Sequence, residues 1–334
     1  MSELRQDPIT KEWVIIATDR ARRPHEFRSR ERGSEVPSSS AKACPFCPGN
    51  ERMTPNEVAA YRNGNKDGPG WWIRVVPNRF PALTPESSDG RGDDPFFRFM
   101  PGVGRHEVII ETPEHNAPFA LLPDSQAEEV VLMYRERYLA LRDDRAVKAV
   151  ILFKNKGESA GTSLEHPHAQ IVGTPVVPQH IRETYAVTTR YYDDTGRCIY
   201  CDLVERECKA KYRIVFESDE FVAFHPFASR SPFETWIAPK RHAASFGQIS
   251  AESAKHFALA LKAVLSKIYR HLNDPDYNFV FHSAPIEDEN KPYFLWHVRV
   301  IPRLTTVAGF EIGSGMFINT ALPEETAAYL NERP

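Results

Sequence analysis

The order of motifs in this chain repeats, and this repeat constrains the fold more than any other feature of the sequence. In the first half, CPFCPGNE precedes WWIRVVPNRFPAL and GRHEVIIETPEHNAPF, and a helical pattern then leads to AVKAVILFKN and HPHAQIVGTP. In the second half, CIYCDLVERE precedes a strand-rich segment, a helical pattern, YNFVFHSAP and YFLWHVRVIPRL. In a chain of 334 residues, such a repeat indicates two similar units, which we place at residues 1–190 and 191–334.

Each unit is predicted to be an α+β fold with a mostly antiparallel sheet and one long helix ahead of its last strands. Asp124 or Ser125 can cap the first helix, because Ser125 and Glu128 fit a capping box before apolar residues that recur at helical spacing. Ser250 opens a second helical pattern that ends near HLNDP. The β-branched and aromatic runs VKAVILF, HEVIIE, FETWIAP and HVRVIP are typical of strands. Residues 28–43 and 85–96 are polar and predict loops.

Composition excludes several classes of protein. The 42 basic and 45 acidic residues give a net charge of −3, which argues against a surface that coats nucleic acid and leaves a local phosphate pocket open. The N-terminal residues lack an apolar stretch of signal-peptide length, and the chain contains no run of about 18 apolar residues. We therefore expect a cytoplasmic protein without membrane or nucleic-acid partners.

Two CxxC pairs are the first candidate metal ligands. Without an export signal, such pairs suggest metal thiolates or a redox motif more than structural disulfides. Zinc favours four nitrogen or sulfur ligands in a tetrahedron, and a CxxC turn supplies two thiolates. We expect two structural zinc ions per chain; the alternative is a pair of reduced, buried cysteines. The predicted ligands are Cys44, Cys47, His115 and His166 for the first zinc, and Cys198, Cys201, His242 and His297 for the second.

The segment HPHAQ places His166, His168 and Gln170 at intervals of two residues. On a strand, such residues face one side, so His166 can bind metal while His168 stays free to react. An imidazole with a pKa near 6.5 is largely unprotonated at pH 7 and is a good nucleophile. Phosphorus is a natural target, because its transfer requires mainly positioning and charge stabilisation, and Gln170 can donate to a phosphoryl oxygen. The alternative is that both histidines bind metal or cap the strand.

Further polar residues suit a phosphate site. The segment NKGESAGTS supplies two glycines, Ser159 and Ser163, whose backbone and hydroxyl donors can bind phosphate oxygens. Arg20 and Arg23 in DRARRP can pair with a second phosphate. His106 and several other histidines lie in polar or loop-like contexts, and we expect them on the surface.

Taken in order, RARRP, CPFC, VPNRFPAL, HEVIIETPEH, NKGESAGTS, HPHAQ, HPFASRSPFETW and GFEIG resemble the galactose-1-phosphate uridylyltransferase family over nearly the whole chain. This family is the transferase branch of the histidine-triad superfamily. The resemblance implies a duplicated histidine-triad-like fold and a ping-pong nucleotidyltransferase with a covalent nucleotidyl-histidine. His168 would attack the α-phosphorus of a nucleotide sugar and release a sugar 1-phosphate, and a phosphorylated acceptor would then take the nucleotide. Hydrolases of the superfamily carry a histidine where this chain has Gln170, which points to transfer.

The resemblance also assigns substrate contacts and a homodimer. If His166 aligns with His297, then His168 aligns with Arg299, and the second half would lack a nucleophile. We therefore expect one active half per chain, with sugar contacts from the other. The implied substrate-binding residues are Arg20 and Arg23 for phosphate, Asn78 and Phe80 near the nucleoside, Asn155, Gly161 and Ser163 around the phosphate, and Phe310 and Glu311 at the sugar.

The expected substrates are UDP-glucose and galactose 1-phosphate, as in galactose metabolism. HVRV and GFEIGSGMFIN lack the second histidine and the glutamine of the well-known uridylyltransferases, and they are more similar to the branch that includes plant ADP-glucose phosphorylase. Adenylyl transfer to inorganic phosphate is therefore the alternative. A remote alternative, based on the CxxC pairs alone, is a zinc-knuckle protein that binds nucleic acid, and the net charge argues against it.

Overall fold

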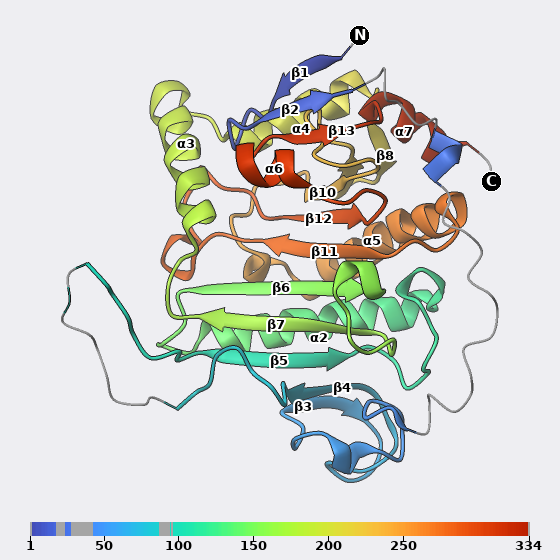
Figure 1. The fold of residues 1–334 in the computed structure, drawn as a ribbon. Coiled ribbons are helices and arrows are strands. Elements are labelled where there is room, and N and C mark those ends of the chain that lie inside the picture. The colour runs from blue at the N-terminus through green and yellow to red at the C-terminus, as the bar shows by residue number, and fades with distance from the viewer. Residues whose placement is uncertain (1, 18–23, 28–42, 87–93, 95, 333–334) are drawn as a thin grey trace.

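One ten-stranded antiparallel sheet extends through both halves of the chain (Figure 1). The computed structural model describes residues 2–17, 24–27, 43–86, 94 and 96–332. The two sets of five strands meet where β6 pairs with β11. In spatial order the strands are β3 (Ala59–Arg62), β4 (Trp71–Pro77), β5 (Arg105–Ile110), β7 (His168–Thr174), β6 (Ala149–Lys156), β11 (Tyr277–His282), β12 (His297–Pro302), β10 (Thr235–Pro239), β9 (Phe221–Phe224) and β8 (Ile214–Glu217).

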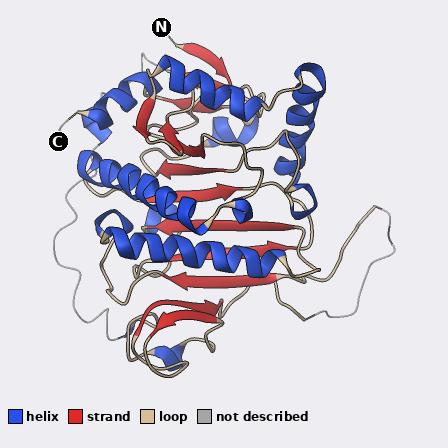
Figure 2. Cartoon of the chain, turned by 180° about the vertical axis from the view of Figure 1, so that it is seen from behind, coloured by secondary structure: helices blue, strands red, loops and turns tan. Residues whose placement is uncertain are grey.

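The two sets of strands form a pseudo-twofold repeat about the β6–β11 pair. In this repeat β3, β4, β5, β7 and β6 correspond to β8, β9, β10, β12 and β11. The long helices α2 (Asp124–Arg142) and α5 (Ala251–Leu272) precede β6 and β11, and they pack together across one face of the sheet (Figure 2). The predicted α+β class and the duplication are confirmed, but the two halves share one sheet.

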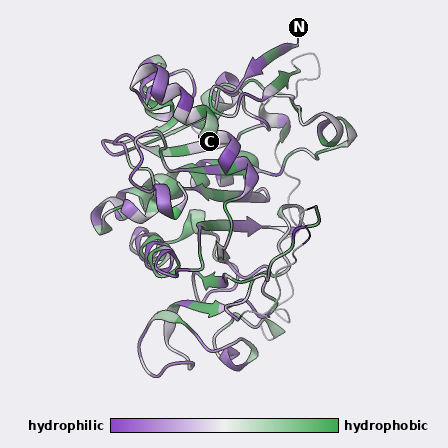
Figure 3. Ribbon diagram, turned by 90° about the vertical axis from the view of Figure 1, so that its left-hand side faces the viewer, coloured by the Kyte–Doolittle hydropathy of each residue, from purple (hydrophilic) through white to green (hydrophobic). Residues whose placement is uncertain are grey.

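The main core lies between the sheet and the two long helices. Ile171 of β7 and Phe281 of β11 belong to the same buried cluster as Tyr134 of α2 and Phe257 of α5. Hydrophobic residues concentrate in the strands, and hydrophilic residues dominate the outer turns (Figure 3). Each large apolar side chain buried in this way contributes about 1.5–3 kcal/mol relative to exposure, so the shared core couples the stability of the two halves.

The two long helices begin differently. Ser250 caps α5 as predicted, because its hydroxyl accepts a hydrogen bond from the Ser253 amide at 3.0 Å. The prediction that a side chain of Asp124 or Ser125 caps α2 is wrong. Pro123 occupies the N-cap in extended backbone, with φ −54° and ψ 149°, and Asp124 is already the first helical residue.

The N-terminal strands pack on the C-terminal half of the chain. β1 (Glu3–Gln6), β2 (Trp13–Ile16) and β13 (Phe317–Asn319) form a small separate sheet, in which β2 and β13 are parallel. Val14 and Ile16 are buried against Ala228. The expected boundary at residues 190/191 falls inside α3 (Gln179–Thr195) and stays a prediction. The remaining helices are α4 (Ile199–Ala210), α6 (Gly309–Ser314) and α7 (Pro323–Asn331), and no helix among the described residues is long and apolar enough to cross a membrane.

Candidate active site and metal centres

His168 is the first residue of β7, a strand in the interior of the sheet. Ala169 and Ile171 face the core, so strand alternation places His168 and Gln170 on the opposite face from the long helices. The Nδ1 atom of His168 lies 2.7 Å from the His166 carbonyl oxygen. A carbonyl only accepts, so Nδ1 carries the proton and Nε2 is the unprotonated nitrogen. Burial lowers the pKa of His168, which keeps this imidazole neutral and nucleophilic.

The first predicted set of metal ligands lies together. Ligand atoms of Cys44, Cys47, His115 and His166 are all within 4.8 Å of one another. The Nδ1 atoms of His115 and His166 lie 3.3 and 3.5 Å from the Cys47 sulfur. The Nε2 atom of His166 donates to the Thr112 carbonyl at 2.8 Å, which turns Nδ1 toward the thiols. Burial lowers the pKa of His166 to about 4, so the ring is in its neutral, metal-binding form. Two sulfurs and two ring nitrogens fit tetrahedral zinc.

His166 itself lies two residues before β7, so strand alternation does not orient it as we expected. Pairing with β5 begins at His168 opposite Ile110, and one further backbone bond joins the Glu111 amide to the Pro167 carbonyl at 3.2 Å. Phe46, in the middle of the CxxC turn, makes edge contacts with both histidines, at ring-centroid distances of 6.1 Å to His166 and 5.2 Å to His168. The predicted metal ligand His166 and the predicted nucleophile His168 therefore both contact Phe46.

Gln170 has partners from two neighbouring strands. Its Oε1 lies 2.8 Å from Nε2 of His106, on β5, and 3.4 Å from Nδ2 of Asn78, which directly follows β4. His106, which we expected on the surface, is half-buried and contacts a predicted catalytic side chain. A signal was present in HEVIIE: His106, Val108 and Ile110 alternate along one strand, so His106 shares a face with residues next to HPHAQ.

Asn155 lies on β6 at the seam between the two halves. Asn278 of β11 donates from Nδ2 to Asn155 Oδ1 at 2.7 Å and to the Ala160 carbonyl at 2.9 Å. Because the oxygen of Asn155 is occupied, its amide nitrogen is the group left to donate to a phosphate.

The loop between β6 and β7 is anchored to the C-terminal half by Asp276. One carboxylate oxygen of Asp276 accepts from the Ser159 amide at 2.9 Å and from its hydroxyl at 2.6 Å. Gly157 has φ +87°, and a Cβ there would lie 1.7 Å from an Asp276 oxygen, so the approach requires glycine. The donors of Ser159 are therefore used within the chain, contrary to our expectation, whereas Gly161 and Ser163 are exposed.

The other predicted substrate contacts stay predictions, and the structure places them as follows. Phe80 is 84% exposed. Phe310 and Glu311 lie on α6, which Figure 1 places beside the C-terminal half of the sheet, away from the beginning of β7. The Glu311 carboxylate accepts from the Ala308 amide at 3.0 Å and so caps its own helix. Arg20 and Arg23 lie outside the described residues.

The second metal cluster has three of its four predicted members. Ligand atoms of Cys198, Cys201 and His242 lie within 4.8 Å of one another, and Nδ1 of His242 is 3.3 Å from the Cys201 sulfur. The adjacent Cys201 thiol lowers the pKa of Cys198 to about 5. His297 is not in this group, and its Nδ1 donates to the Leu295 carbonyl at 3.1 Å. The expectation that His297 is the fourth ligand is not met.

The pseudo-twofold repeat explains why His297 stands apart. Like His168, His297 begins its strand and donates from Nδ1 to the carbonyl two residues earlier. Tyr200, in the middle of the second CxxC, lies 5.3 Å from the His297 ring, as Phe46 lies 5.2 Å from His168. His297 therefore corresponds to His168, and our alignment of His166 with His297 is shifted by two residues. Leu295, which cannot bind metal, takes the place of His166.

The space next to His297 is filled by other side chains. Its ring stacks on Trp236 at 4.4 Å and on His282 at 4.9 Å. Arg299, at the position that corresponds to Gln170, pairs with the buried Glu234 at 2.6 Å. Burial lowers the pKa of His297 to about 3. We still expect only one active half per chain. The second half does have a histidine at the corresponding position, His297, but other side chains enclose it.

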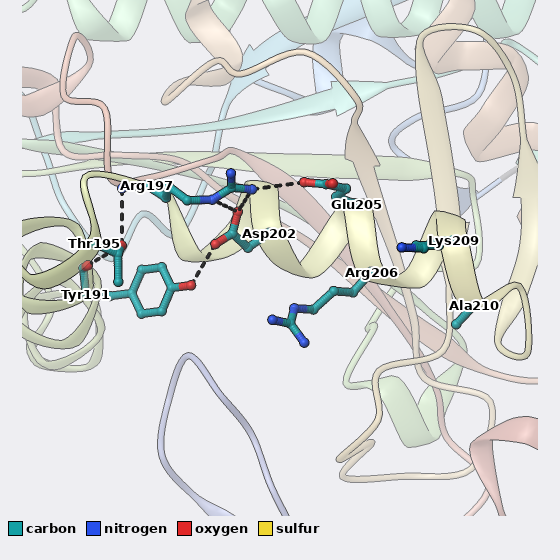
Figure 4. Close-up of a pocket in the computed structure, with 8 residues that line it drawn as sticks. All are labelled: Tyr191, Thr195, Arg197, Asp202, Glu205, Arg206, Lys209 and Ala210. Atoms are coloured by element: carbon teal, nitrogen blue, oxygen red, sulfur yellow. Dashed lines mark hydrogen bonds and ion pairs between the residues drawn. The ribbon is translucent and has the colours of Figure 1, made fainter.

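An open pocket of about 610 Å³ lies between α3 and α4 (Figure 4). Tyr191 donates to Asp202 at 2.6 Å, and Arg197 bridges Asp202 and Glu205 at 2.5 and 3.0 Å. These ion pairs join Arg197 to Asp202 and Glu205, and Arg206 and Lys209 also line the pocket. None of the predicted site residues lines it, so the candidate active site stays at His168.

Comparisons with known proteins agree with the motif order. The family model "galactose-1-phosphate uridyl transferase, N-terminal domain" matches residues 1–178, and the model of the C-terminal domain matches residues 183–332. ADP-glucose phosphorylase of Arabidopsis thaliana is 35% identical over 334 residues, which cover 99% of this chain and 92% of that protein. Galactose-1-phosphate uridylyltransferase of Thermotoga maritima is 32% identical over 343 residues, with coverages of 99% and 98%.

Solved structures are similar over the same length. A structure of the Arabidopsis ADP-glucose phosphorylase with bound ADP-glucose has a TM-score of 0.83 and 32% identity, covering 100% of this chain and 99% of that one. A uridylyltransferase structure has a TM-score of 0.75 and 28% identity, with coverages of 99% and 97%.

Proposed function

Because the chain belongs to the galactose-1-phosphate uridylyltransferase family, we propose that it transfers a nucleotidyl group from a nucleotide sugar through His168. The resemblance inferred from the motifs is confirmed, and with it the class of enzyme, a nucleotidyltransferase. The observation that carries the proposal is the neutral His168, whose Nδ1 proton is fixed on the His166 carbonyl at 2.7 Å. This bond presents the unprotonated Nε2 at the face of the sheet opposite the helices.

The geometry suits a two-step displacement. In the first step, Nε2 of His168 forms a bond to the α-phosphorus, and the bond from that phosphorus to the bridging oxygen breaks. The electron pair leaves with the sugar 1-phosphate, which is already an anion and needs little help from a general acid. The Nδ1–H bond to the His166 carbonyl stabilises the positive charge that develops on the ring. An oxygen of the second phosphorylated substrate then attacks the same phosphorus and frees His168.

Two neutral donors are available for the oxygens on phosphorus. The oxygen of Gln170 is occupied by His106, and that of Asn155 by Asn278, so each side chain has an amide nitrogen to offer. Preorganised donors of this kind stabilise charge in the transition state without reorganising, and each is typically worth about 10²–10³ in kcat. The Cys44, Cys47, His115 and His166 set would hold zinc as a structural ion that anchors the segment before His168.

We favour ADP-glucose as the nucleotide sugar and inorganic phosphate as the acceptor. Support comes from the 35% identity with ADP-glucose phosphorylase and the TM-score of 0.83 with its ADP-glucose complex. UDP-glucose with galactose 1-phosphate, our first expectation, stays the second candidate, because the Thermotoga uridylyltransferase is 32% identical over nearly its whole length.

Each donor assayed with each acceptor would separate the two candidates. Turnover of ADP-glucose with phosphate, and none of UDP-glucose with galactose 1-phosphate, is the expected result. The reverse pattern would select the uridylyltransferase.

The nucleophile can be tested by trapping the covalent enzyme. Incubation with either nucleotide sugar labelled at the α-phosphate should leave label on the protein in an alkali-stable, acid-labile bond. His168→Gly should abolish this label. His297→Phe is the matched control, because a phenyl ring keeps the stacking on Trp236 and His282 and loses one hydrogen bond. The assignment would be contradicted if His168→Gly kept the label, or if His297→Phe lost the label while His168→Gly kept it.

We also propose a homodimer. Phe80, Phe96, Phe97 and Phe99 are all exposed between β4 and β5. Several large apolar side chains in one exposed segment mark an interaction site in many proteins. Sedimentation equilibrium should give twice the mass of one chain, and a monomer at micromolar concentration would refute this.

A further inference from the structure

We propose that His106 is a positioning residue that fixes the side-chain amide of Gln170 for binding a phosphoryl oxygen. This inference rests on the nucleotidyl transfer proposed above and adds a residue to which the motifs gave no role. His106 does not touch the reacting atoms; it acts through Gln170, which follows the nucleophile by two residues on the same face of β7.

The protonation of His106 follows from its two partners. The backbone amide of Ala82 lies 3.1 Å from Nδ1 of His106, and a backbone N–H can only donate. Nδ1 is therefore an acceptor without a proton, and the proton of the neutral ring is on Nε2. Nε2 lies 2.8 Å from Oε1 of Gln170 and donates to it. The backbone amide of Ala82 thus fixes the tautomer of His106. In this tautomer, Nε2 of His106 can bind only the oxygen of the Gln170 amide.

Asn78 also directs a donor to the oxygen of Gln170. Its Oδ1 accepts from the Phe80 amide at 2.9 Å, so its Nδ2 is the atom directed to Gln170 Oε1 at 3.4 Å. Nδ2 of Asn78 and Nε2 of His106 lie 3.2 Å apart, and because both are donors they converge on one acceptor. The oxygen of Gln170 is held between two donors, and no contact among the described residues uses its Nε2.

This arrangement determines whether Gln170 attracts or repels a phosphoryl oxygen. A glutamine amide has two orientations of nearly equal shape, one with N–H toward a ligand and one with the carbonyl oxygen toward it. The first binds a phosphoryl oxygen, and the second repels it. If His106 is lost, the weaker contact with Asn78 is left, and Gln170 can turn its oxygen toward the phosphate.

A double-mutant cycle on the full-length enzyme tests this role. The variants are His106→Phe, which keeps a ring without donors, Gln170→Ala, and the two together. Rapid-quench measurement of label transfer to His168 gives the rate of the first step with ADP-glucose and with UDP-glucose. We expect His106→Phe to slow this step about 10- to 100-fold, with a smaller change in KM. In the Gln170→Ala background, the same substitution should change the rate less than twofold, because its target is gone.

A fourth variant guards against a simple loss of folding. His106→Gln keeps an N–H donor and should recover most of the wild-type rate, and thermal melting should show that all four variants are folded. Equal, additive losses from His106→Phe in both backgrounds would overturn the inference, as would an unchanged rate in His106→Phe. Wild-type enzyme that takes no label from either nucleotide sugar would instead refute the proposed function, and this inference with it.

Discussion

Among single substitutions beneath the candidate active site, those that break the buried ion pair of Lys154 and Glu111 should have the largest effect on stability. The Lys154 ammonium contacts the Glu111 carboxylate, and their side chains are 3% and 0% exposed. The Tyr134 hydroxyl also donates to Glu111. These groups lie on the helix side of the sheet, under the strand that carries His168. Lys154→Met removes the cation and leaves a buried carboxylate with one neutral partner.

The expected cost follows from this burial. Removal of one member of a buried pair destabilises a protein by about 3–5 kcal/mol, because the remaining charge is uncompensated. Replacement of both members is much less costly, so Glu111→Gln combined with Lys154→Met should recover most of the loss, with the glutamine oxygen still available to Tyr134. The chain offers a matched control in Lys148 and Glu287, which pair at 2.6 Å with side chains 45% and 75% exposed. Lys148→Met should cost less than about 1 kcal/mol.

Urea unfolding followed by circular dichroism measures these differences as shifts of the midpoint at constant slope. The backbone of Glu111 also bonds the Pro167 carbonyl, so Lys154→Met should in addition slow the labelling of His168. The reasoning is refuted if Lys154→Met and Lys148→Met have the same midpoint, or if the double variant is no more stable than Lys154→Met.

Three further outcomes are expected. Burial lowers the pKa of His225 to about 4, below its ordinary value of about 6.5. Between these two pH values the unfolded chain binds more protons than the folded chain. The contribution of neutral His225 to the free energy of unfolding is therefore fully present above about pH 6.5 and falls by up to about 3 kcal/mol toward pH 4. His225→Gln should flatten this loss in urea unfolding from pH 7.5 to 4.5, and an unchanged pH profile would contradict it. Elemental analysis should find one zinc ion fewer in Cys47→Ser than in the wild type, and no fewer in Cys208→Ser, whose cysteine lies outside both clusters. Equal metal content in both variants would refute the first site. Asn278→Leu frees the amide of Asn155 and should lower kcat/KM about tenfold, and a wild-type value would show that this bond does not position Asn155.

Short-range patterns in the sequence were sufficient to predict the fold class and those candidate site residues that are close together in the chain. A CxxC turn brings its two sulfurs together by itself, and a serine before a helix finds its partner three residues away, so Cys44 with Cys47 and the cap at Ser250 were predictable. The order of motifs implied the duplication, because two halves with similar sequence patterns bury similar faces of their strands and helices. HPHAQ similarly predicted that His168 and Gln170 share one face of a strand, without knowledge of the strands around them.

Contacts between strands required the tertiary structure. The bond from His106 to Gln170 depends on the pairing of β5 with β7, and nothing in the sequence shows that Lys154 and Glu111 meet beneath it. The correspondence of His297 illustrates the physical limit. Side chains on a strand alternate with period two, so a shift of two residues keeps every one of them on the same face. From the sequence, His297 could equally match His166 or His168. Only its bond to the Leu295 carbonyl and its contact with Tyr200 place it with His168.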